Sequence, residues 1–139
     1  MQNLIFCGPQ PKSAMPKMID AADVGLAILR ATPTHRTVYP NKVFDYMACA
    51  RPVVLAIDGV ARRLVCDEAS AGVFVEPGDG SALARTVLDL SRQPQRCAEM
   101  GERGRAWVVK NVSRKVLAQR YVDVLESLLR ARGVHNRGT

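Results

Sequence analysis

Residues 36–54 read RTVYPNKVFDYMACARPVV, and they predict a polar loop, a short helix and a buried strand, in that order. Pro40 and Asn41 mark the start of the helix, because an asparagine at the N-cap can accept a hydrogen bond from an unpaired backbone N–H. Pro52 marks its end, because proline disfavours the helical conformation in the residue before it. The helix therefore connects the polar loop directly to the strand.

Two charged residues of this helix, Lys42 and Asp45, lie three positions apart and so share one face. The positive end of the helix dipole and its exposed N–H groups suit a phosphate. Asp45 can accept hydrogen bonds from ribose hydroxyls, while Lys42 and Arg36 can each meet a phosphate oxygen. The same spacing also fits a surface acid that pairs with Lys42 or Asn41, and solvated basic side chains. The spacing alone leaves both interpretations open.

Short apolar segments alternate with helical patterns along the chain. Buried strands are predicted at residues 4–7, 24–29, 53–57 and 72–75, with amphipathic helices between and after them. Such alternation predicts an α/β fold, a Rossmann-like layered domain with a parallel sheet, followed by two C-terminal helices. Residues 1–132 are expected to form this domain, and residues 133–139 a polar tail.

The loops that follow these strands are expected at one edge of the sheet. They comprise residues 8–12, 30–42, 58–61 and 76–81. Ligands of parallel α/β sheets bind at the carboxyl ends of the strands. The second loop holds most of the polar residues that neither capping nor packing explains, so it is the first candidate for a binding site.

The charge of the chain restricts its partners. Twenty Lys and Arg against thirteen Asp and Glu give a net charge of +7, which suits nucleic acid, an acidic membrane surface or an anionic substrate. The excess is spread over helices in the last third of the chain, and three Phe, three Tyr and one Trp offer few surfaces for stacking bases. We therefore expect no nucleic-acid partner.

The absence of some patterns is also informative. No apolar run approaches the roughly 18 residues of a membrane helix, and no signal-peptide pattern is present. With four scattered cysteines, this predicts a cytoplasmic protein with buried free thiols. No Walker loop, GxSxG or HExxH occurs, and His35 and His135 lack partners at metal-binding spacing, so neither a metal nor a cofactor is expected.

Gly101 and Gly104 fall in a helical pattern and predict that this helix packs closely against a neighbouring element.

Four segments together resemble the C-terminal domain of retaining glycosyltransferases of the large group 1 family, also called family 4. They are residues 3–9, 15–24, 39–48 and 72–79, and the third has the family's PxKxxEYMA appearance. They follow the family's order over nearly the whole chain. The family has the GT-B fold, in which two Rossmann-like domains face a cleft and the C-terminal one binds the nucleotide-sugar donor. The resemblance implies that this chain is that C-terminal half.

The resemblance also implies roles for particular residues. Asp45 stands where the family has a glutamate that holds the ribose. The family's paired glutamate, eight residues earlier, is replaced here by Thr37, so the catalytic residues stay unassigned. The turn at Gly8 and Pro9 matches backbone groups that meet the nucleobase. The loop with Arg36, Thr37, Tyr39, Asn41 and Lys42 matches the region of the donor sugar and diphosphate.

A family member is roughly two to three times as long as this chain, as two domains require. The resemblance implies that the N-terminal acceptor domain and the first strands of the donor domain are missing. In the strand order 3-2-1-4-5-6, the missing strands lie between residues 4–7 and the next strand. Residues 4–7 are therefore expected to pair elsewhere, to swap into a second chain as a dimer, or to fray.

The expected function is that of a donor-binding fragment of a retaining, nucleotide-sugar-dependent glycosyltransferase in surface polysaccharide or glycolipid synthesis. Its partners would be the nucleoside diphosphate sugar and the missing acceptor domain, with peripheral membrane association of the full-length enzyme. The fragment alone is expected to transfer nothing. Three alternatives stay open: a sugar-nucleotide epimerase of the same fold, a non-enzymatic α/β interaction domain, and a basic nucleic-acid binder.

Overall fold

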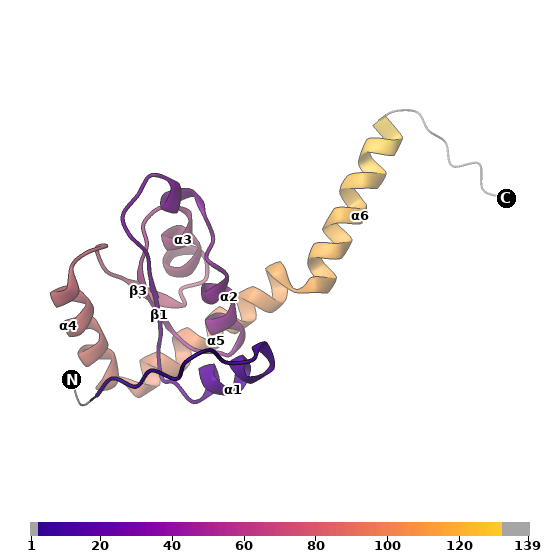
Figure 1. Cartoon of the computed structure of the whole chain (residues 1–139). Helices are drawn as coiled ribbons and strands as arrows, with labels where there is room; N and C mark the ends of the chain where they lie inside the picture. Colours follow the sequence, from indigo (N-terminus) through magenta and orange to yellow (C-terminus); the bar gives the residue numbers. More distant parts are fainter. Residues whose placement is uncertain (1–2, 132–139) are drawn as a thin grey trace.

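A computed structural model describes residues 3–131 of the chain. Within these residues the fold is built on a three-stranded parallel sheet in the order β1-β2-β3 (Figure 1). The strands are β1 Gly25–Ile28, β2 Val53–Ala56 and β3 Gly72–Phe74. Every residue of the central strand β2 is buried, whereas exposed and buried residues alternate in β1. The predicted α/β fold with a parallel sheet is confirmed.

Helices connect and cover the strands, close to the predicted positions. In chain order they are η1 Lys12–Ala14, α1 Met15–Asp20, η2 Thr34–Thr37, α2 Asn41–Ala48, α3 Val60–Arg62, η3 Arg63–Glu68, α4 Gly80–Ser91, α5 Pro94–Val112 and α6 Arg114–Ala131. α3 continues into the π-helical turn η3 without a break. Asp79 caps α4 by accepting a hydrogen bond from the N–H of Ala82 at 2.8 Å.

The core has two layers, one on each face of the sheet. On one face, Met47 of α2 and Val65 of η3 pack with Leu55 of β2. On the other face, Leu90 of α4 packs with Val54 of β2. The apolar positions of β2 therefore face both layers, which explains why the sequence shows an unbroken apolar run there.

The helix α5 passes beneath the amino ends of the strands. A Cβ atom at Gly101 would overlap the carbonyl oxygen of Ala50, and one at Gly104 would lie 2.9 Å from the Cβ of Ala71. Ala50 and Ala71 lie just before β2 and β3, so the two glycines bring α5 into close contact with that edge of the sheet. The predicted packing role of both glycines is confirmed. The carboxyl ends of the strands, at the opposite edge, are not covered by α5.

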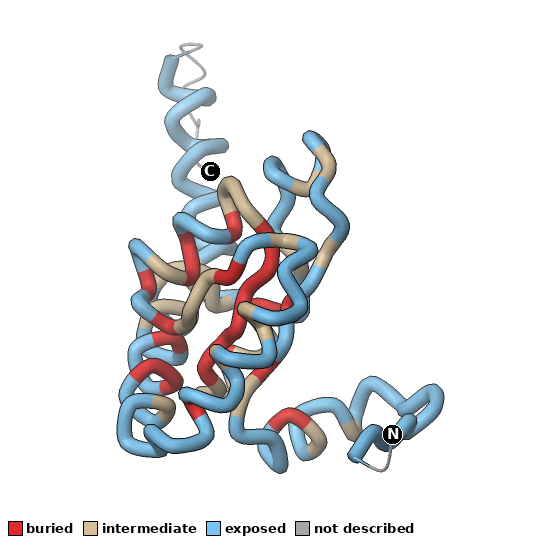
Figure 2. The backbone as a smooth tube through the Cα atoms, turned by 90° about the vertical axis from the view of Figure 1, so that its left-hand side faces the viewer, coloured by how far each residue is buried: buried red, intermediate tan, exposed pale blue. Residues whose placement is uncertain are grey.

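Residues 4–7 do not form the predicted buried strand. Ile5 is 84% exposed and Phe6 86% exposed, and the segment lies apart from the buried strands (Figure 2). An apolar run becomes a strand only where a neighbouring strand takes up its backbone hydrogen bonds, and no strand of residues 3–131 does so here. The prediction of a strand is therefore wrong, and so is that of a core position for Phe6. Residues 4–7 pair with no other strand of residues 3–131, so of the three predicted outcomes the described chain agrees with fraying, and a swap between chains stays a prediction.

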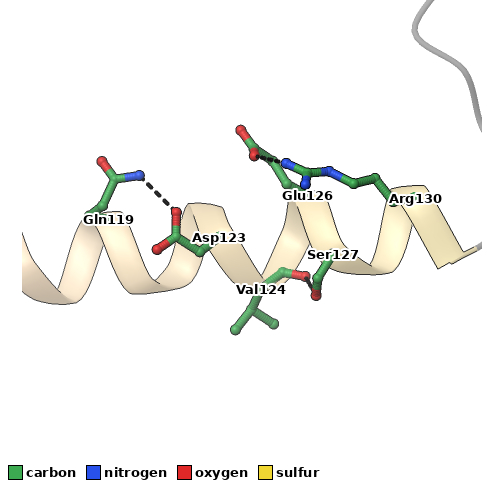
Figure 3. Close-up of polar contacts among 6 residues, drawn as sticks. All are labelled: Gln119, Asp123, Val124, Glu126, Ser127 and Arg130. Carbon is green, nitrogen blue, oxygen red and sulfur yellow. Dashed lines mark hydrogen bonds and ion pairs between the residues drawn. The ribbon is translucent and has the colours of Figure 1, made fainter.

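The last helix, α6, extends away from the sheet and its covering helices in Figures 1 and 2, and none of its residues is buried. Its polar contacts run along its own surface (Figure 3): Gln119 donates to Asp123 at 2.9 Å, and Arg130 pairs with Glu126 at 2.9 Å. The predicted tail 133–139 lies outside the described residues. No helix within residues 3–131 is both long and apolar enough to cross a bilayer.

Deleting residues 114–139 is expected to leave the rest of the chain folded and about as stable as before. Because α6 buries none of its residues, the melting temperature should change by less than about 2 °C. Thermal unfolding followed by circular dichroism, at equal protein concentrations, measures this. A fall of more than about 5 °C would instead show that α6 covers part of the protein in solution.

Candidate functional site

A cavity of about 310 Å³ opens at the carboxyl ends of the three strands. Its lining comes from the segments after β1, β2 and β3: Leu29, Arg30, Ala31, Thr32, Pro33, His35, Arg36, Ile57, Asp58, Glu76 and Pro77. This is the edge of the sheet at which the sequence predicts ligand binding. Its lining includes two arginines and two carboxylates.

Only one of the predicted donor-binding residues, Arg36, lines this cavity. The others are divided among three places. Thr37 ends η2 and Tyr39 lies in the short segment between η2 and α2, while Asn41, Lys42 and Asp45 lie on the first two turns of α2. Gly8 and Pro9 are exposed in the N-terminal segment, where Gly8 has φ 63°. The structure thus brings Arg36 to the cavity and keeps the α2 residues outside its lining.

The start of α2 differs from the prediction by one residue. Pro40 occupies the N-cap with an extended backbone (φ −67°, ψ 128°), and no side chain caps the helix. Asn41 is consequently the first helical residue, and its predicted role as N-cap is wrong. The N–H groups at this end of α2 therefore have no side-chain cap, a condition that allows an anion to bind there.

Asp45 and Lys42 are both exposed on α2, while Val43 and Met47 are buried against the sheet. Within residues 3–131, neither Asp45 nor Lys42 forms an ion pair within 4.0 Å. The alternative interpretation, in which Asp45 is a surface acid that forms an ion pair with Lys42, is therefore not supported by the structure. Burial, followed by the charge of Asp45, raises the pKa of the neighbouring Tyr46 phenol.

Asp58, two residues after the end of β2, forms ion pairs with two arginines at the cavity. One of its carboxylate oxygens lies 2.9 Å from Nη2 of Arg36, and the other lies 3.5 Å from Nη1 of Arg62. The guanidinium of Arg62 also stacks over the Phe74 ring, 4.0 Å from its centre. The backbone N–H of Gly59 holds the pKa of Asp58 below its usual value; burial opposes this shift, and the charges of Arg36 and Arg62 add to it.

The loop between β1 and α2 is held by its own hydrogen bonds as well. Nδ1 of His35 lies 2.6 Å from the carbonyl oxygen of Arg30, and the hydroxyl of Thr37 donates to the carbonyl of Thr34 at 2.9 Å. The sequence predicts Asp58 and Gly59 only as part of the loop 58–61, and their contacts with the loop between β1 and α2 were missed. The available signal was an Asp-Gly pair directly after a buried strand, opposite an arginine-containing loop.

The remaining candidate chemistry is limited. No group of three or more His, Cys, Asp or Glu side chains that could hold a metal occurs in the described part of the chain. All four cysteines are free, as predicted, but Cys7 is exposed and the other three are only partly buried. Burial, with the nearby Asp67 charge, raises the pKa of Cys66 to about 11, so this thiol stays protonated at neutral pH.

A comparison with known families matches residues 1–93 to the family described as glycosyl transferases group 1. The chain belongs to this family. It is 32% identical over 128 residues to a GDP-mannose-dependent monoacylated alpha-(1-6)-phosphatidylinositol monomannoside mannosyltransferase of Corynebacterium glutamicum, covering 91% of this chain and 33% of that protein. It is also 34% identical over 85 residues to a GDP-mannose-dependent alpha-(1-6)-phosphatidylinositol monomannoside mannosyltransferase of Mycolicibacterium smegmatis, covering 61% of this chain and 22% of that protein.

Among solved structures, sucrose-phosphate synthase from Thermosynechococcus elongatus has a similar fold. The TM-score is 0.77 at 21% sequence identity, over 94% of this chain and 31% of that protein. The resemblance to group 1 glycosyltransferases with a GT-B fold is therefore confirmed. The chain spans about a third or less of the length of these relatives.

Proposed function

We propose that this chain is the donor-binding part of a retaining, nucleotide-sugar-dependent glycosyltransferase of surface polysaccharide or glycolipid synthesis. The observation that carries the proposal is Asp45, exposed on α2 and without an ion pair in the described chain, at the position where the sequence resemblance implies a ribose contact. The two mannosyltransferase relatives support a lipid-linked acceptor, because their names specify phosphatidylinositol monomannosides. Such an acceptor would bring the full-length enzyme to the membrane surface.

The proposed donor contacts follow from the chemistry of each group. The carboxylate of Asp45 accepts hydrogen bonds from the ribose hydroxyls, and Lys42 and the first N–H groups of α2 meet the diphosphate. In the proposal, as the family resemblance implies, backbone groups at Gly8 and Pro9 bind the base, and Thr37 and Tyr39 bind the sugar. Transfer breaks the bond between the anomeric carbon of the sugar and the diphosphate oxygen and forms one between that carbon and an acceptor hydroxyl oxygen, whose proton is released. Positive charge at α2 stabilises the leaving diphosphate. The acceptor is held by a separate domain, so this chain alone transfers no sugar.

Replacing Asp45 with alanine is expected to weaken binding of GDP-mannose by about tenfold or more, because the ribose hydroxyls lose a charged acceptor. Binding of inorganic phosphate should be unchanged, since phosphate meets Lys42 and the helix end instead. Isothermal titration calorimetry with GDP-mannose, UDP-glucose, ADP-glucose and phosphate measures both.

A matched control is Asp89→Ala, which removes an exposed acid from α4. This variant should bind every ligand as the wild type does. An equal loss for nucleotide sugar and phosphate in Asp45→Ala would place the ribose contact elsewhere. Failure of the wild-type chain to bind any of the three nucleotide sugars would contradict donor binding by this chain.

A further inference from the structure

We infer that Asp58 is a positioning residue for donor binding, which holds the 3-10 turn η2 (Thr34–Thr37) in place through Arg36. The inference rests on the proposed function, in which the donor's sugar and diphosphate meet the loop that contains η2. Asp58 itself need not touch the donor. Its effect depends on two contacts with the same residue, one through a side chain and one through the main chain.

The first contact is ionic. Asp58 is 33% exposed and Arg36 66% exposed, with 2.9 Å between carboxylate and guanidinium. A pair this exposed contributes little by itself. Here, however, the carboxylate is fixed from the other side by Arg62, which is in turn held over the ring of Phe74. Arg36 therefore pairs with a carboxylate that is already oriented, so less conformational freedom is lost when the pair forms.

The second contact is made by the residue after Asp58. Gly59 has φ 89°, in the left-handed region, and a Cβ atom there would overlap the carbonyl oxygen of Arg36. The main chain of Arg36 thus lies directly on Gly59. Two consecutive residues after β2 hold Arg36 by its side chain and by its backbone, so η2 cannot move away from the sheet without losing both contacts.

The position of η2 matters for the donor because the segment that follows it is short. Only Val38, Tyr39 and Pro40 separate η2 from α2, which is itself fixed by the buried Val43 and Met47. The loop is therefore fixed at α2 by the core and at η2 by Asp58 and Gly59. With its charge engaged by Asp58, Arg36 acts by positioning this loop and not as a phosphate ligand.

The test uses the full chain with Asp58→Asn, Arg36→Gln, the double variant, and Arg63→Gln as control. Asp58→Asn and Arg36→Gln should each weaken GDP-mannose binding by about fivefold, and the double variant should bind no more weakly than either single variant. Amide hydrogen exchange of residues 34–37, measured by mass spectrometry without ligand, should become at least about fivefold faster in all three. Arg63→Gln, which removes an exposed arginine that pairs with Glu68 at 3.7 Å and leaves the contacts of Asp58 in place, should change affinity less than about twofold.

Two results would overturn the inference. Losses that add in the double variant would make Arg36 a direct donor contact, and unchanged exchange at residues 34–37 would show that Asp58 does not hold the turn. If Asp58→Asn fails to fold, Arg36→Gln gives the same exchange test, because the Arg36 side chain is largely exposed. If the wild type does not bind GDP-mannose, the proposed donor is contradicted, whereas the exchange comparison still decides the role of Asp58.

Discussion

Replacing Gly101 with valine is expected to lower the free energy of unfolding by about 3 kcal/mol. Gly101 is buried on α5, where any side chain would meet the carbonyl oxygen of Ala50. That oxygen belongs to a rigid turn: Ala50 has φ 53°, and the N–H of Arg51 donates to the carbonyl of Tyr46 at 2.9 Å to close α2. This backbone turn cannot change conformation as easily as a side chain can, so the overlap has to be relieved by a movement of α5.

Movement of α5 would also separate Gly104 from Met47 and Ala71, which adds lost packing to the overlap. Urea unfolding followed by circular dichroism measures the change as a lower midpoint. The matched control is Gly80→Val, another glycine within a helix, which has open space around it. The control should change stability by about 0.5 kcal/mol or less. Similar midpoints for the two variants would contradict the close contact of α5 with the sheet.

The parts of the fold that the sequence predicts well are those that local pattern and burial determine together. β2 lies between two strands and two helical layers, so every position is buried, and the unbroken apolar run places it correctly to within one residue. Gly101 and Gly104 could be predicted as sites of close helix packing. Glycine lowers the stability of a helix, and close contact with a neighbouring element offsets this loss. The capping role of Asp79 is equally local.

Other parts depend on contacts that no local pattern contains. Residues 4–7 have the composition of a strand but no neighbouring strand within the described chain, and only the three-dimensional arrangement reveals that. The contact of Arg36 with Asp58 and Gly59 joins segments more than 20 positions apart, so the turn and the loop could each be predicted but not their contact. Asn41 was displaced from the N-cap because Pro40 adopts the extended conformation there.

The sequence predicts correctly that a cavity lies at the carboxyl ends of the strands, but not which residues line it. The loops after β1, β2 and β3 form a cavity, as the alternation of strands and helices predicts, but residues 8–12, the fourth predicted loop, do not line it. Yet Arg36 alone of the predicted residues lines it, and there it pairs with Asp58. Spacing along a helix establishes that Lys42 and Asp45 share a face, but not which cavity that face borders. The donor contacts of the α2 residues therefore stay predictions.

Replacing Leu55 with alanine is expected to lower the free energy of unfolding by about 3 kcal/mol, within the usual range of about 2–5 kcal/mol for a buried leucine. Leu55 lies in the middle of β2 and is fully buried in the cluster that contains Val43, Met47 and Val65. These side chains come from α2 and η3, so the space left by the missing methyl groups cannot close without moving two helices. Chemical unfolding measures the loss.

The matched control is Leu26→Ala on the neighbouring strand β1, where the leucine is 41% exposed on the edge of the sheet. Because part of the Leu26 side chain already contacts water, its truncation should cost about 1 kcal/mol or less. An equal loss at both positions would mean that the face of β1 that carries Leu26 is covered in solution. A loss at Leu26 that grows with protein concentration would identify a second chain as the cover, because only an intermolecular contact depends on concentration. That outcome would support the predicted exchange of residues 4–7 between chains, whereas a small, concentration-independent loss would leave β1 as an open edge.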